Sequence, residues 1–121
     1  MAEIIQADRS EAIRKILNGV RCPNTVYIWL DNTAADTRAT MISFFSECSA
    51  GPIINKRKHE LYFCNGSEIW FRSANNAENL HGLRFHGAVI TTKIDDLSAI
   101  AMQSCLTSTK GWLLLVNDDN D

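Results

Sequence analysis

Residues 60–72 read ELYFCNGSEIWFR, two β-favouring runs separated by Asn65-Gly66. This dipeptide is typical of a tight hairpin, because both central positions of a type I′ turn need a positive φ. We therefore predict an antiparallel β-hairpin with a type I′ turn. Alternation along the strands leaves Tyr62 and Trp70 on one face, as an aromatic patch of the kind that anchors protein interfaces. The opposite, core-facing group is expected to be Leu61, Phe63, Ile69 and Phe71.

Three continuous apolar runs lie elsewhere in the chain, at Val26–Leu30, Phe85–Thr91 and Trp112–Val116. Each is short and lacks polar alternation, which indicates strands that are buried on both faces. Amphipathic helices are predicted around them, at residues 9–20, 35–48 and 97–105. Strands that alternate with helices favour parallel pairing. The predicted fold class is α/β, with three layers, a mostly parallel central sheet and the added antiparallel β-hairpin.

The chain has 121 residues, the usual size of one domain, and no linker divides it. We predict a single domain over residues 1–116 and an acidic tail over residues 117–121, expected to be a solvated terminus, with mimicry of nucleic-acid phosphate as the alternative. A net charge of −2 means that nucleic acid would need a local basic patch. No apolar run is long enough for a membrane span or a leader, so we expect a cytoplasmic protein.

The four cysteines are Cys22, Cys48, Cys64 and Cys105. They never approach the Cys-x-x-Cys spacing of zinc sites, so we expect free, buried thiols in a reducing compartment. A mixed site that combines cysteine with His59, His81 or His86 stays open, although no spacing favours it. We predict no metal and no cofactor.

The centre of the chain resembles the middle of phage terminase large-subunit ATPase domains. Residues 64–74 are similar to the family's Asn-Gly-Ser hairpin, and residues 79–90 to its Leu-Arg-Gly-like turn and the apolar strand that ends in the Walker B carboxylates. Residues 26–45 and 97–116 are similar to flanking elements of the same core. The first of these contains a Thr-x-x-x-Thr-Arg stretch at Thr33, Thr37 and Arg38. The resemblance implies a P-loop-NTPase-like fold.

The sequence departs from that family at the phosphate-binding loop. A working loop, G-x-x-x-x-G-K-[ST], uses glycines to bring backbone N–H groups to the phosphates, Lys to neutralise them and Ser or Thr to hold Mg²⁺. Residues 4–11 at the matching place read IIQADRSE, without glycine. If Arg9-Ser10 takes the place of the Lys-Ser/Thr pair, the loop is shortened and Asp8 puts negative charge where a phosphate would sit.

The Walker B site departs as well. The strand at residues 88–90 continues into Thr91-Thr92-Lys93 where the family has Asp-Glu, the acids that complete the Mg²⁺ site and orient water. Asp95 and Asp96 come too late and are expected to cap the next helix. His81 replaces the family's Arg before Gly82. We therefore assign no catalytic residue and predict that the chain is not an enzyme.

The predicted function is a non-catalytic phage-type accessory or regulatory protein that binds a protein partner, such as a viral or host nucleic-acid motor or nuclease. The candidate protein-binding residues are Tyr62, Trp70 and Arg72. One alternative is a nucleic-acid-binding module that uses the hairpin and the basic residues Lys56, Arg57, Lys58 and Arg84. A divergent ATPase is the third hypothesis.

Overall fold

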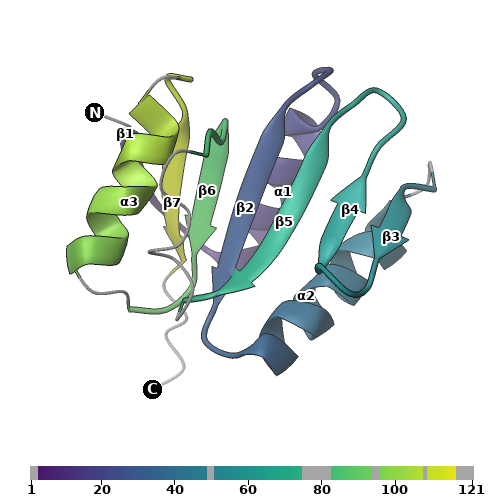
Figure 1. Ribbon diagram of the computed structural model, residues 1–121, viewed down its shortest axis with the longest axis horizontal. Coiled ribbons are helices and arrows are strands. Elements are labelled where there is room, and N and C mark those ends of the chain that lie inside the picture. Colours follow the sequence, from purple (N-terminus) through teal and green to yellow (C-terminus); the bar gives the residue numbers. More distant parts are fainter. Residues whose placement is uncertain (1–2, 49–50, 75–82, 94–95, 108, 117–121) are drawn as a thin grey trace.

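The computed structural model describes residues 3–48, 51–74, 83–93, 96–107 and 109–116 (Figure 1). These residues form one seven-stranded sheet with helices on both faces. Helices α1 (Arg9–Gly19) and α2 (Ala34–Glu47) pack on one face, and α3 (Asp96–Thr107) packs on the other. The three-layer α/β architecture predicted from the sequence is confirmed.

The strand order within the sheet is β1-β7-β6-β2-β5-β4-β3. The strands are β1 (Glu3–Ala7), β2 (Val26–Asp31), β3 (Ile53–Asn55), β4 (Glu60–Tyr62), β5 (Glu68–Ser73), β6 (Gly87–Ile90) and β7 (Trp112–Val116). The first five in spatial order are parallel, whereas β4 and β3 pair antiparallel at one side. The five parallel strands all end at the same side of the sheet, which we call the carboxyl edge (bottom of Figure 1).

An apolar cluster fills each face of the sheet. On the face of α1 and α2, Trp29 packs edge-on against Phe44, and Phe44 also packs against Phe71, with ring centroids 5.3 Å apart in both pairs. On the opposite face, Ile28 and Phe85 are buried beneath the α3 side chains. Because neighbouring residues of a strand point to opposite faces, the continuous apolar run of β2 supplies both clusters.

The β4–β5 hairpin forms as predicted, but its turn differs from the predicted type. Gly66 has φ +90°, whereas Asn65 is not among the residues with positive φ. The nitrogen of Phe63 donates to the carbonyl of Ser67 at 2.9 Å, which leaves three residues in the loop, one more than in a two-residue type I′ hairpin. The Asn65 side chain instead bonds outward: its amide donates to the carbonyl of Val20 at 2.8 Å, and its oxygen accepts from the nitrogen of Ser67 at 3.0 Å. The type I′ prediction is wrong, because these contacts hold Asn65 without a positive φ.

The sequence patterns predict neither β1 nor β3, which form the two sides of the sheet. In β1, Ile5 pairs with Leu114 of β7, a partner more than one hundred residues away in the chain. In β3, Ile53 pairs with Tyr62 across a short connection. Both strands have too few apolar positions for a periodic signal, and each depends on a neighbouring strand for its hydrogen bonds.

Some expectations lie outside the described residues: the His81-Gly82 turn, the Asp95 cap and the acidic tail. Within the residues that the structure does describe, no helix combines the length and apolar character needed to cross a membrane.

Candidate functional site

The connection between β1 and α1 is a single residue, Asp8, at the carboxyl edge. Its carboxylate Oδ1 accepts a hydrogen bond from the backbone nitrogen of Glu11 at 2.8 Å, which caps the first turn of α1. The next side chain, Arg9, lies over the indole of Trp29, with its guanidinium carbon 5.5 Å from the ring centroid. A carboxylate therefore occupies the helix terminus that an anion would otherwise approach.

The end of β6 lies beside the end of β2 at the same edge. Thr91 Oγ1 is 3.0 Å from Asp31 Oδ1, and Asp31 is 2 % exposed. The Asp31 carboxylate also accepts from the indole nitrogen of Trp29 at 3.0 Å and from the hydroxyl of Thr40 at 2.8 Å. These neutral donors tie β2, β6 and α2 together around one buried acid. Asp31 is not among the site residues predicted from the sequence, and Thr33 caps α2 by accepting from the nitrogen of Asp36.

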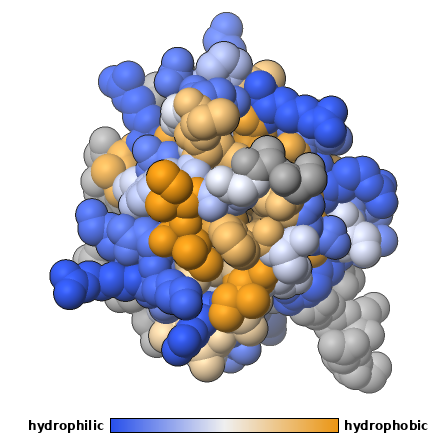
Figure 2. Space-filling model, turned by 90° about the vertical axis from the view of Figure 1, so that its right-hand side faces the viewer, coloured by the Kyte–Doolittle hydropathy of each residue, from blue (hydrophilic) through white to orange (hydrophobic). Residues whose placement is uncertain are grey.

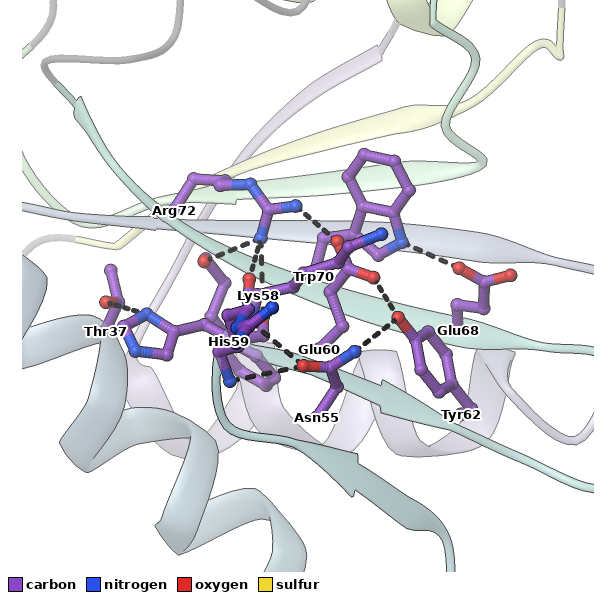
Figure 3. A network of polar contacts seen from close by, with 11 residues as sticks. Thr37, Asn55, Lys58, His59, Glu60, Tyr62, Glu68, Trp70 and Arg72 are labelled. Atoms are coloured by element: carbon purple, nitrogen blue, oxygen red, sulfur yellow. Dashed lines mark hydrogen bonds and ion pairs between the residues drawn. The ribbon is translucent and has the colours of Figure 1, made fainter.

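The predicted protein-binding residues Tyr62, Trp70 and Arg72 lie together on one face of the β4–β5 hairpin (Figure 3). Two acids of the same face, Glu60 and Glu68, join them. The hydroxyl of Tyr62 donates to Glu60, which also forms an ion pair with Arg72. The indole nitrogen of Trp70 donates to Glu68 at 2.8 Å, and the Arg72 guanidinium carbon lies 4.9 Å from the Trp70 ring centroid. We call this five-residue group the hairpin face.

The hairpin face is preorganised by a buried charge pair. Glu60 is 4 % exposed, and a buried carboxylate is costly unless it is paired and hydrogen-bonded. Arg72 also donates to the carbonyl of Lys58 at 2.7 Å, which fixes its guanidinium. The hydrogen bond from Tyr62 to Glu60 raises the pKa of the Tyr62 hydroxyl, because ionisation would remove the donated proton next to a carboxylate.

Trp70 is less exposed than the predicted aromatic patch requires. Its ring packs edge-on against Phe85, with centroids 5.4 Å apart, and both Trp70 and Tyr62 are only partly exposed. The predicted core group is confirmed for Leu61, Ile69 and Phe71, which are fully buried. The Tyr62 and Trp70 side chains thus form a rigid, partly covered surface.

The basic residues of the nucleic-acid alternative are not all brought together. Lys56, Arg57 and Lys58 are exposed on the turn between β3 and β4, where the Asn55 side chain accepts from the backbone nitrogens of Arg57 and Lys58 at 3.2 and 3.0 Å. This turn lies next to the carboxyl end of β5, because the nitrogen of Phe71 donates to the carbonyl of His59. Arg84 precedes β6 and lies toward the opposite edge of the sheet.

An apolar strip borders the hairpin face at the free side of β3. Figure 2 shows apolar side chains gathered in the middle of this side of the molecule, surrounded by hydrophilic ones. Ile53 is 71 % exposed, and Ile42 and Phe45 of α2 are 48 and 37 % exposed. Ile53 lies directly across from Tyr62 in the antiparallel pair. Ile53 is therefore contiguous with the hairpin face.

All four cysteines are free thiols, but they are not all buried as expected: Cys22 and Cys64 are exposed, Cys48 is partly exposed and Cys105 is buried. Burial raises the pKa of the Cys48 and Cys105 thiols. Within the described part of the chain, no three His, Cys, Asp or Glu side chains come together as metal ligands.

This arrangement of a mostly parallel sheet, covering helices and a hairpin at one side defines a P-loop-NTPase-like α/β fold. The solved structures that share it include the ATPase domain of the large terminase of Thermus phage P74-26 and a mutant of that domain. Their TM-scores are 0.65 and 0.64, each at 14% sequence identity over 95% of this chain. This chain has the fold of a phage terminase ATPase domain and covers 58% of the length of these domains. By sequence, no family model and no curated protein matches.

Proposed function

We propose that this chain is a non-catalytic, phage-type accessory or regulatory protein that uses the terminase-ATPase fold to bind a protein partner. The observation that carries the proposal is the β1–α1 connection, which consists of Asp8 alone. The Asp8 carboxylate caps α1. A phosphate-binding loop surrounds its phosphates with successive backbone N–H groups and a lysine. A one-residue connection offers no such loop, and Asp8 would repel a phosphate.

The end of β6 supports the same proposal. Mg²⁺-dependent phosphoryl transfer uses carboxylates to complete the metal site and to place water. Thr91, Thr92 and Lys93 supply hydroxyls and a cation at this place. The acid next to them, Asp31, is buried and already accepts hydrogen bonds from three side chains. Its carboxylate oxygens therefore stabilise the fold and are not available to a metal ion.

The partner in this proposal contacts the hairpin face and the apolar Ile53 beside it. Tyr, Trp and Arg are the residue types that contribute most to protein interfaces, and side chains already held in place lose little entropy on binding. We propose that the partner is a viral or host nucleic-acid motor or nuclease. A domain with a terminase-like fold and no nucleotide site can bind within such an assembly without hydrolysing ATP.

Site-specific photo-crosslinking tests the partner surface. A benzophenone amino acid at Tyr62 should crosslink to one defined protein in cell extract, and the same probe at Arg14, an exposed residue of α1 on the opposite side of the sheet, should not. A purified form of the captured protein should then bind the chain and lose affinity when Ile53 is replaced by Asp. Equal crosslinking from both positions, or binding unaffected by Ile53→Asp, would contradict the proposal.

A nucleic-acid-binding module is the second candidate, favoured by the three exposed cations on one ordered turn, Lys56, Arg57 and Lys58. Binding through phosphates weakens steeply as salt rises. Fluorescence anisotropy with labelled single-stranded and duplex DNA, at low and moderate salt, tests this function. A nucleic-acid-binding function predicts salt-sensitive binding. The Lys56/Arg57/Lys58 triple-alanine variant should lose this binding, and the Arg84→Ala variant should retain it.

A further inference from the structure

A cleft of about 560 Å³ lies between α3 and the strands β1, β7 and β6. Ligand pockets in proteins range from about 300 to 1,000 Å³, so a small organic molecule fits within it. Its floor is formed by apolar strand residues that point toward α3: Ile4, Ile90, Leu113 and Leu115. Met102 and Ala99 of α3 line its wall. Gln6 of β1 and Gln103 of α3 also line it, so the cleft is mainly apolar and carries two neutral amides.

The end of the cleft at the carboxyl edge is polar. Thr92 and Lys93 line it there, and Lys93 is the one formally charged side chain among the lining residues. Over the described ranges, the Thr92 hydroxyl and the Lys93 ammonium make no hydrogen bond and no ion pair. The neighbouring Thr91 differs, because its hydroxyl already contacts the Leu30 carbonyl and Asp31. A hydroxyl donor and a cation thus stand side by side at the rim of an apolar cleft.

The cleft does not include the β1–α1 connection, since none of its lining residues belongs to α1 and Asp8 is not among them. It does include Thr91, Thr92 and Lys93, which follow β6. It opens on the α3 face of the sheet, whereas α1 packs on the other face. Open α/β sheets commonly bind ligands near the carboxyl ends of their strands, and this cleft reaches that edge.

We propose that the cleft binds a small amphipathic carboxylate, with its apolar chain along Ile4, Leu113 and Met102 and its carboxylate at Thr92 and Lys93. A carboxylate accepts hydrogen bonds from the hydroxyl and pairs with the ammonium. The apolar chain removes exposed surface of the floor from water, including that of Ile4, which is 53 % exposed. A cationic head group would meet Lys93 and be repelled. This site does not depend on the proposed function, because it includes neither Asp8 nor a residue of the hairpin face.

Isothermal titration with decanoate, below its micelle concentration, tests the site on the full chain. Decan-1-ol and decyltrimethylammonium serve as neutral and cationic probes of the same chain length. Saturable one-to-one binding is expected for decanoate and weaker binding for the other two. Lys93→Gln should weaken decanoate by roughly two- to fivefold, since an exposed ion pair contributes little, and should leave decan-1-ol unchanged.

Two tryptophan variants of α3 separate the cleft from adventitious surface binding. Ala99 is exposed and lines the cleft, so Ala99→Trp should fill it and abolish decanoate binding without disturbing the core. Ile100 is 60 % exposed and does not line the cleft, so Ile100→Trp should bind decanoate normally. The proposal is overturned by an absence of decanoate binding, by equal affinity for the cationic probe, or by equal effects of the two tryptophans.

Discussion

Asp8 and Glu11 are joined by a hydrogen bond of 2.8 Å from the backbone nitrogen of Glu11 to the carboxylate of Asp8, at the place where a P-loop protein holds phosphate. In the proposed non-catalytic function, the acid that would repel a nucleotide is also the cap that stabilises α1.

The first prediction concerns this cap. Asp8→Ala should lower the free energy of unfolding by about 1 kcal/mol, because it leaves N–H groups of the first turn without a side-chain acceptor. Asp8→Asn retains a capping oxygen and should cost much less. Urea denaturation followed by circular dichroism measures both. Equal stability of the alanine variant and the unmodified chain would show that the cap does not contribute.

Asp31 provides the second prediction. Asp31→Ala removes the acceptor shared by Trp29, Thr40 and Thr91, and unsatisfied buried donors cost about 1–3 kcal/mol, to which the lost packing adds. Asp31→Asn keeps the shape and one carbonyl oxygen, so its loss of stability should be the smaller one. Thermal unfolding compares the two variants. A larger loss for Asn than for Ala would contradict this description of the site.

The third prediction concerns the ion pair of Glu60 and Arg72. Arg72→Ala leaves the buried Glu60 carboxylate without its counter-charge, which should cost about 1–3 kcal/mol because Tyr62 still donates to it. The double variant Glu60→Leu with Arg72→Met should recover much of that stability, because it removes both charges. Lys58→Ala is the matched control, since Lys58 is exposed and Arg72 contacts its carbonyl, not its side chain. Chemical denaturation of all three decides whether the pair acts as described.

Cysteine reactivity gives a fourth prediction. The thiolate is the reactive form, and a raised pKa lowers its fraction near neutral pH. Cys22 and Cys64 are exposed, whereas Cys105 is buried and its pKa is raised by burial. Timed alkylation with iodoacetamide, read by mass spectrometry, should modify Cys22 and Cys64 first and Cys105 only on unfolding. Early modification of Cys105 in the folded chain would be inconsistent with this core.

The sequence predicts the layers of the fold well because the apolar runs of β2, β6 and β7 supply buried side chains to both faces of the sheet. It also predicts that Tyr62 and Trp70 share a face, and the observed register agrees, with Glu60 opposite Trp70 and Glu68 opposite Tyr62. That register depends on the longer turn, because a two-residue type I′ turn at Asn65-Gly66 would have placed Tyr62 opposite Ile69. Alternation along the same two strands could have added Glu60, Glu68 and Arg72 to the face. The burial of Glu60 could not be predicted, because it depends on the register that places Trp70 opposite it and Arg72 nearby.

Strand direction explains the failure at Arg84. The basic turn at residues 56–58 precedes β4, which runs antiparallel to β5 and so begins at the carboxyl edge, whereas Arg84 precedes the parallel strand β6 at the other edge. Spacing along the chain does not reveal this separation. The strand β1 is missed for a related reason, because its pairing with β7 joins the two ends of the described chain.

Titration with ATP and Mg²⁺, combined with a phosphate-release assay, distinguishes a non-catalytic chain from an ATPase. A non-catalytic chain should give no saturable heat of binding and no phosphate release above the buffer rate, both unmodified and as Asp8→Ala. Saturable binding of ATP together with phosphate release that Arg9→Ala abolishes would contradict the proposed function, and would identify the chain as an ATPase with a divergent phosphate site.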